Sequence, residues 1–118
     1  MAELTLPQVY RRAVEVLDER GWYQGYYVDP EGCKVCVAGA LAVVLGGTPT
    51  SEDADGPEVI WPAGQDGKAL RNYWYRTVDG LAAVVPGGIG QWNDAPRRTV
   101  EEVKAALLRA AEEAERDD

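Results

Sequence analysis

The segment from Cys36 to Leu45 constrains the fold more than any other feature, because it is apolar on nearly all sides. It reads C-V-A-G-A-L-A-V-V-L and is followed by Gly46-Gly47. A surface helix carries one apolar stripe, whereas a helix that is apolar all round is buried, and glycine commonly ends a helix. The sequence therefore predicts a short buried helix at the centre of the core.

Two amphipathic helices are predicted near the ends of the chain. Residues 5–20 place apolar side chains at helical spacing, and Thr5 and Gln8 have the spacing of a capping box. Near the other end, Thr99 and Glu102 form a second capping box before an equally periodic apolar face. Each of these helices has one apolar face with which to cover the central helix.

Turn and strand signals precede the buried helix. Residues 22–28 are rich in Trp and Tyr and are expected to be extended. The turn Asp29-Pro30-Glu31-Gly32 has Pro and Gly in favourable positions, so residues 33–35 are expected to pair back as a short hairpin strand.

A third helix is expected after the buried one, from about Gly67 to Val78. Asp79-Gly80 is expected to break or kink it, and Pro86-Gly87-Gly88 marks a clear break. Residues 89–96 then form a segment that is expected to be irregular or extended.

The whole chain of 118 residues has the length of one domain. Residues 48–67 are rich in Pro, Gly and acidic side chains and are expected to form a long loop, and the charged tail 112–118 is expected to fray. We therefore predict a mainly α fold of about four helices, with a possible short β-hairpin before the buried second helix. An α+β fold is the alternative.

Composition excludes several classes of function. The chain contains no His, which removes Ser-His-Asp and Cys-His catalytic arrangements and HExxH zinc helices. The formal net charge is −8, so we expect no direct binding to nucleic acid, which depends on Lys and Arg to neutralise phosphates. We find no apolar run long enough to cross a membrane and no signal peptide. We therefore expect a cytoplasmic protein with no membrane partner, cofactor or metal.

Cys33 and Cys36 form a C-x-x-C pair at the start of the buried helix. A helix N-terminus stabilises a thiolate, so thiol–disulfide exchange is one interpretation. A zinc site is another, but it needs about four ligands and the chain has no further Cys and no His. The third interpretation is structural: Cys36 is a small buried side chain and Cys33 a hairpin residue.

The segment Trp92-Asn93-Asp94 supports two interpretations. Asn93 and Asp94 have the chemistry to bind a ligand hydroxyl or ammonium group, with Trp92 as a stacking wall. Alternatively, Asn93 and Asp94 form a turn by bonding their own downstream backbone, and Trp92 anchors the loop to the core. Trp22 and Tyr26 belong to an aromatic set without Phe, and such amphipathic rings serve both in ligand pockets and in cores.

Several short motifs in order resemble an uncharacterised family of small proteins from high-GC Gram-positive bacteria and their phages. They are G-W-Y-Q-G from Gly21, V-C-V-A-G-A-L from Val35, and W-N-D from Trp92 before a Thr-capped helix. The family pattern often has Cys where this chain has Tyr23, and Cys33 is an addition, so the C-x-x-C pair is not a family motif. The resemblance implies no known activity, but it makes a phage or prophage accessory role a reasonable expectation.

The leading hypothesis is a non-enzymatic binding protein for an unidentified protein or small molecule. Its candidate ligand-binding residues are Trp22, Tyr26, Cys36, Trp92, Asn93 and Asp94. The alternatives are a cysteine-dependent enzyme, with Cys36 as nucleophile and Asp94 as the orienting or basic group, and an acidic mimic of nucleic acid. The mimic would use the acidic residues that cluster at positions 52–58 and again in the C-terminal tail, residues 112–118.

Overall fold

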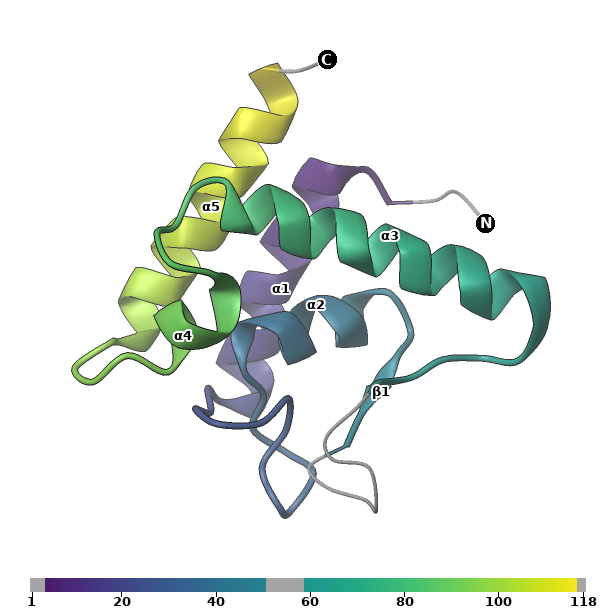
Figure 1. Ribbon diagram of the computed structural model, residues 1–118, viewed down its shortest axis with the longest axis horizontal. Helices are drawn as coiled ribbons and strands as arrows, with labels where there is room; N and C mark the ends of the chain where they lie inside the picture. Colours follow the sequence, from purple (N-terminus) through teal and green to yellow (C-terminus); the bar gives the residue numbers. More distant parts are fainter. Residues whose placement is uncertain (1–3, 51–58, 117–118) are drawn as a thin grey trace.

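The fold is built around the buried helix that the sequence predicts. The computed structural model describes residues 4–50 and 59–116, and α2 (Val37–Val44) lies at its centre (Figure 1). Residues 37–42 are all buried. Cys36 is the N-cap residue, and the helix ends at the C-cap residue Leu45. The prediction of a central apolar helix is confirmed.

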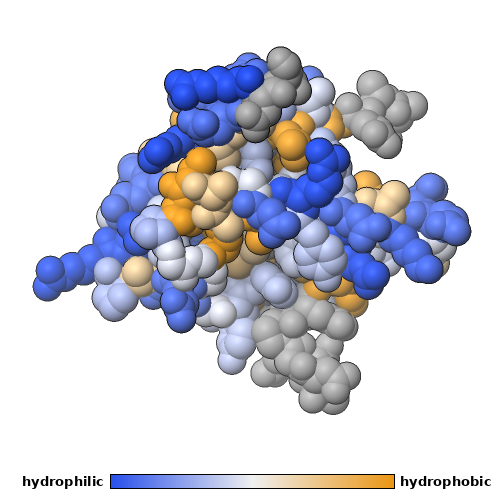
Figure 2. Space-filling view, turned by 45° about the horizontal axis from the view of Figure 1, so that its top comes forward, coloured by the Kyte–Doolittle hydropathy of each residue, from blue (hydrophilic) through white to orange (hydrophobic). Residues whose placement is uncertain are grey.

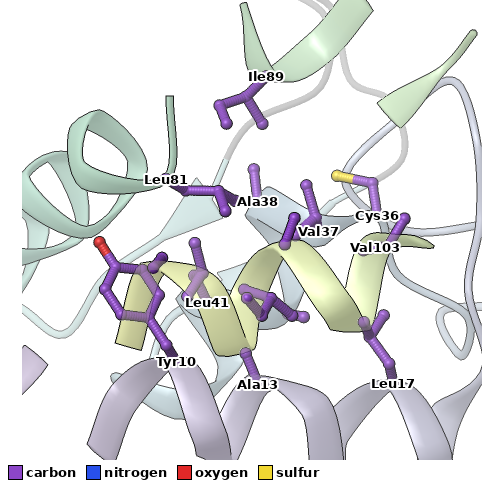
Figure 3. Packing of buried hydrophobic residues seen from close by; sticks show 14 of the residues in the cluster. Tyr10, Ala13, Leu17, Cys36, Val37, Ala38, Leu41, Leu81, Ile89 and Val103 are labelled. Atoms are coloured by element: carbon purple, nitrogen blue, oxygen red, sulfur yellow. The ribbon is translucent and has the colours of Figure 1, made fainter. Parts of the chain in front are cut away.

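Two long helices, α1 (Leu6–Arg20) and α5 (Val100–Arg116), pack against each other. Of the two, α1 also packs along α2, whereas α5 contacts α3. Figure 3 shows Tyr10, Ala13 and Leu17 of α1 projecting from one face of the helix into the core. The opposite faces are polar, and hydrophilic side chains cover most of the surface seen in Figure 2.

Both predicted capping boxes are present. The Thr5 side chain accepts a hydrogen bond from the Gln8 backbone amide, and the Gln8 side chain accepts one from the Thr5 amide in return. Thr99 and Glu102 make the same reciprocal pair at the start of α5. Since α5 extends to Arg116, the part of the predicted frayed tail that the structure describes is helical.

The third helix is longer than the sequence predicts. It is α3 (Gly64–Ala82), which lies beside α2 and runs without a break through Asp79-Gly80 (Figure 1). A Cβ atom at Gly80 would lie 2.3 Å from the Tyr10 hydroxyl oxygen. That hydroxyl donates a buried hydrogen bond of 2.7 Å to the Thr77 carbonyl. Gly80 is therefore required for the close approach of α1, and it does not end the helix.

The expected mainly α fold with a short hairpin is confirmed, with some differences in detail. Strands β1 (Thr48–Pro49) and β2 (Val59–Ile60) form an antiparallel pair after α2, inside the segment expected to be a loop. Before α2, the expected hairpin is reduced to isolated bridges from Val35 to Trp22 and Val28.

The segment after Gly88 is also more regular than expected. Residues predicted to be irregular or extended form the short helix α4 (Ile89–Asn93). Gly88 is the N-cap residue of α4 and has a φ of 89°, in the left-handed region that glycine favours. The glycine therefore lets the chain change direction just before the helix begins. No helix in the described residues is long and apolar enough to span a membrane.

Candidate functional site

Asn93 is buried and uses all of its hydrogen-bonding capacity. Only 1% of its surface is exposed. Its Oδ1 accepts hydrogen bonds from Trp22 Nε1 at 2.8 Å and from the Val37 amide at 3.1 Å. Its Nδ2 donates to the Tyr23 carbonyl at 3.2 Å and to Asp94 Oδ1 at 2.9 Å. Asn93 therefore joins α4 to the first amide of α2 and to residues 22–28, the Trp- and Tyr-rich segment that we call the aromatic loop.

Two further side chains extend this connection. Asp94 Oδ1 accepts a second hydrogen bond, of 2.9 Å, from the Gly25 amide. Gln24 Nε2 donates to the carbonyls of Asn93 and Ala95, at 3.0 and 3.1 Å. We call the side chains of Trp22, Gln24, Asn93 and Asp94 the loop latch.

The latch tests one part of the interpretations of the W-N-D segment, the expected turn bonds of Asn93 and Asp94. In the turn interpretation, the Asn and Asp side chains bond their own downstream backbone. In the structure they bond residues of the aromatic loop and of α2, far earlier in the chain. The turn interpretation is therefore wrong for both side chains.

Trp92 is an anchor of α4 and lies beneath an arginine. It is 8% exposed, and the guanidinium carbon of Arg98 lies 4.2 Å from the centre of its ring. Arg98 Nε also donates a hydrogen bond of 2.8 Å to the Trp92 carbonyl. Trp92 therefore packs into the core, as the anchoring interpretation expects, and Arg98 holds it there.

A pocket of about 330 Å³ lies next to the latch, and Asn93 and Asp94 belong to both. It is bordered by the aromatic loop, the start of α2, α3 and α4. Four of the six candidate residues line it, namely Tyr26, Cys36, Asn93 and Asp94, whereas Trp22 and Trp92 do not. Figure 3 shows Cys36 and Ala38 on the side of α2 where Ile89 lies, and all three line the pocket.

Aromatic rings form much of the pocket wall. Trp74 is buried and lines the pocket. Its ring centre lies 5.8 Å from that of Tyr27 and 5.3 Å from that of Tyr75. Trp74 Nε1 donates a hydrogen bond of 2.9 Å to the Ala38 carbonyl, which fixes α3 on α2. Tyr26 and Tyr75 are 47% and 51% exposed, so their rings are accessible to a ligand.

The sequence analysis did not bring Tyr27, Trp74 and Tyr75 to the site, although all three line the pocket. The helical period places Trp74 on the inner side of α3, and Tyr75 follows at the edge of the apolar stripe. A Tyr at the edge of an apolar face is the one signal that the sequence offered. Gly90, also at the pocket, offered none.

The chain matches the family of unknown function DUF6197 over residues 1–113. It belongs to this family. No curated protein and no solved structure matches it. Membership in DUF6197 therefore supplies no activity, and the pocket has to be interpreted from its own chemistry.

In this DUF6197 protein, Cys36 is the N-cap residue of α2. Its Sγ accepts a hydrogen bond of 3.3 Å from the Gly39 amide, as an N-cap side chain does. Burial raises the pKa of the thiol to about 11, although the backbone amides of Gly39 and Ala38 act to lower it. Cys36 is therefore protonated at neutral pH, which is unfavourable for a nucleophile or a metal ligand.

The other chemical candidates find little support in the described residues. Cys33 is exposed, Cys36 is buried, and both are free thiols. Within residues 4–50 and 59–116, no three Cys, Asp or Glu side chains are grouped to hold a metal ion. The acidic cluster at residues 52–58 lies outside the described residues.

Proposed function

We propose that this protein is a non-enzymatic binding protein that takes a small molecule into the pocket beside Asp94. The observation that supports this most is the composition of the pocket wall. Exposed rings of Tyr26 and Tyr75, the buried ring of Trp74 and one carboxylate converge on a single concavity. Ligand pockets typically combine an apolar, aromatic lining with a few polar groups that fix orientation.

The loop latch supports the proposal because it prepares the pocket before a ligand arrives. Asn93 and Asp94 are held by hydrogen bonds from Trp22, Gly25 and Val37. A wall that is already ordered loses little conformational entropy on binding, so more of the contact energy contributes to affinity. The volume of about 330 Å³ lies at the lower end of the range for ligand pockets and suits a small ligand.

The enzymatic alternative is less well supported by the same residues. It needs a Cys36 thiolate and a proton acceptor, but burial raises the pKa of Cys36. Asp94 is the only carboxylate among the described residues that line the pocket. It lies near enough to raise the pKa of Cys36 further, so it opposes formation of the thiolate.

The biological setting is proposed from the motif resemblance alone. The W-N-D segment and the motifs around Gly21 and Val35 resemble those of the uncharacterised family described in the sequence analysis. We propose an accessory protein of a phage or prophage in a high-GC Gram-positive bacterium, acting in the cytoplasm. A protein partner that inserts a side chain into the same pocket is the second candidate for what it binds.

The test is a screen by amide NMR spectra against a library of small metabolites. Ligands that bind should shift the amides of Gly25, Ala38 and Gly90, which line the pocket. Gly90→Leu should abolish these shifts, because a Cβ atom there meets no atom within 4 Å and the added side chain begins in open space at the pocket wall.

The matched control is Ala105→Leu, which adds the same side chain on the exposed face of α5. It should leave binding unchanged. If no compound shifts the pocket amides, or if Gly90→Leu and the control bind equally well, the proposed function is wrong.

A further inference from the structure

We propose that the pocket selects an organic cation, a small molecule with an ammonium or methylated ammonium group. This inference rests on the proposed binding function and names the class of ligand. It follows from the juxtaposition of one carboxylate with the rings of Tyr26, Trp74 and Tyr75 at the pocket, in a protein of net charge −8.

The carboxylate of Asp94 supplies the charge. Its Oδ1 is held by Gly25 and Asn93, whereas its Oδ2 makes no hydrogen bond to any described residue. No Lys or Arg is among the described residues that line the pocket, so no neighbouring cation on the wall neutralises Asp94. An ammonium group is the ligand partner that this carboxylate lacks.

The aromatic wall favours the same ligand. The face of an aromatic ring is electrostatically negative and attracts a cation lying within about 6 Å of its centre. Tyr26 and Tyr75 are about half exposed, and the rings of Trp74 and Tyr75 lie 5.3 Å apart. Tyr26, Trp74 and Tyr75 line the same pocket, and aromatic residues gathered in one site are a known way to recognise methylated ammonium groups.

Two backbone amides that could attract an anion already donate hydrogen bonds within the protein. The start of α2 borders the pocket, and a helix N-terminus usually attracts anions through its free amides. Here the Val37 amide donates to Asn93 Oδ1 and the Gly39 amide to Cys36 Sγ. The net charge of −8 also repels anions and attracts cations over longer distances.

The first measurement compares three probes of similar shape by amide NMR titration of the full chain. They are choline, its uncharged isostere in which a tert-butyl group replaces the trimethylammonium group, and the anion tert-butylacetate. Choline should shift the pocket amides with saturation and bind about tenfold more tightly than the uncharged isostere, and tert-butylacetate should not bind.

The second measurement uses Asp94→Asn, which removes the charge but keeps an Oδ1 acceptor for Gly25 and Asn93. It should weaken choline binding about tenfold and leave the uncharged isostere unaffected. Glu112→Gln, an equal loss of charge on the exposed face of α5, should change neither affinity by a comparable amount.

The outcomes separate this inference from the function on which it rests. If the uncharged isostere or tert-butylacetate binds at the pocket as tightly as choline, the cation inference is wrong and the binding function stands. The same conclusion follows if Asp94→Asn leaves choline affinity unchanged. If no probe binds and the metabolite screen finds only uncharged or anionic pocket ligands, the inference also fails. If that screen finds no pocket ligand, both proposals fail.

Discussion

The loop latch and the pocket share the neighbouring residues Asn93 and Asp94 but use them in opposite ways. Asn93 is 1% exposed, and its four hydrogen bonds all stay within the protein. Asp94 is exposed, and only its Oδ1 takes part in the latch. Adjacent polar residues of one motif therefore differ in role: Asn93 is fully used in holding the fold together, whereas Asp94 keeps one carboxylate oxygen outside the latch and lines the pocket. Substitutions on the latch should therefore lower stability, and those at the pocket should alter binding.

The largest effect is expected for Asn93→Ala. The change leaves the buried Val37 amide and the part-buried Trp22 Nε1 without an acceptor. An unsatisfied buried donor costs about 1–3 kcal/mol, so the free energy of unfolding should fall by about 2–4 kcal/mol. Urea unfolding followed by circular dichroism measures it.

Asn72→Ala on the exposed side of α3 is the matched control and should change stability by less than about 0.5 kcal/mol. Asp94→Asn should also be mild, because it keeps an acceptor for Gly25 and Asn93. If Asn93→Ala is as mild as either, the latch does not stabilise the fold and the comparison fails.

The next effect is expected for Gly39→Ala, where the aromatic loop crosses the start of α2. A Cβ atom on Gly39 would lie 2.2 Å from the Tyr27 carbonyl oxygen, which also accepts a hydrogen bond from the Cys36 amide. The backbone would have to move, at a cost of about 1–3 kcal/mol in the free energy of unfolding.

Thermal unfolding of Gly39→Ala checks this expectation. An unchanged or raised melting temperature would show that the loop is not held against α2, and the contrast between latch and pocket would then disappear. The loop would also move together with Tyr26 and Tyr27, so ligand binding should weaken in this variant as well.

The sequence predicts the helices that depend on local signals. Both capping boxes and the apolar α2 were recognised from residues a few positions apart, and the structure confirms them. The continuity of α3 was missed because Gly80 serves a contact with Tyr10, on a different helix. A glycine that makes room for another element looks the same in sequence as one that ends a helix.

The candidate site shows the same limit. Cys36, Asn93 and Asp94 were named from their chemistry, and the structure brings them to one pocket. The hydrogen bonds of Asn93 to Trp22 and Val37 join residues 71 and 56 positions apart, so no local pattern predicts them. Tyr75 reaches the site through the packing of α3 on α2, which one sequence does not encode in any short motif.

A smaller effect is expected at alkaline pH, from the Cys36 thiol beneath the pocket. Burial raises its pKa from the ordinary value of 9.0 to about 11. A raised pKa in the folded state means that the unfolded chain loses its proton first as pH rises. Stability is therefore complete below about pH 9 and falls above it, by about 1 kcal/mol at pH 10.

Urea unfolding from about pH 8 to pH 10 measures this loss, and Cys36→Ala should reduce it. Tyr10, whose pKa is raised to about 12 by burial, should account for a further loss that begins above about pH 10. If Cys36→Ala and the unaltered protein lose the same free energy of unfolding between about pH 8 and pH 10, burial does not hold the thiol in its protonated form and this prediction is wrong.

The smallest effect is expected for Gly90→Ala, on the pocket side, and its sign is opposite to that of Gly39→Ala. Gly90 lies within α4, its φ is not in the left-handed region, and an added Cβ atom meets nothing within 4 Å. Alanine in a helix restricts the unfolded chain and should raise the free energy of unfolding by about 0.5–1 kcal/mol.

Thermal unfolding of both glycine variants measures the contrast directly. A gain at Gly90 beside a loss at Gly39 means that the pocket wall has room for a ligand while the latch side has none. A loss at both positions would mean that α4 is packed as tightly as the loop, and no open wall would remain.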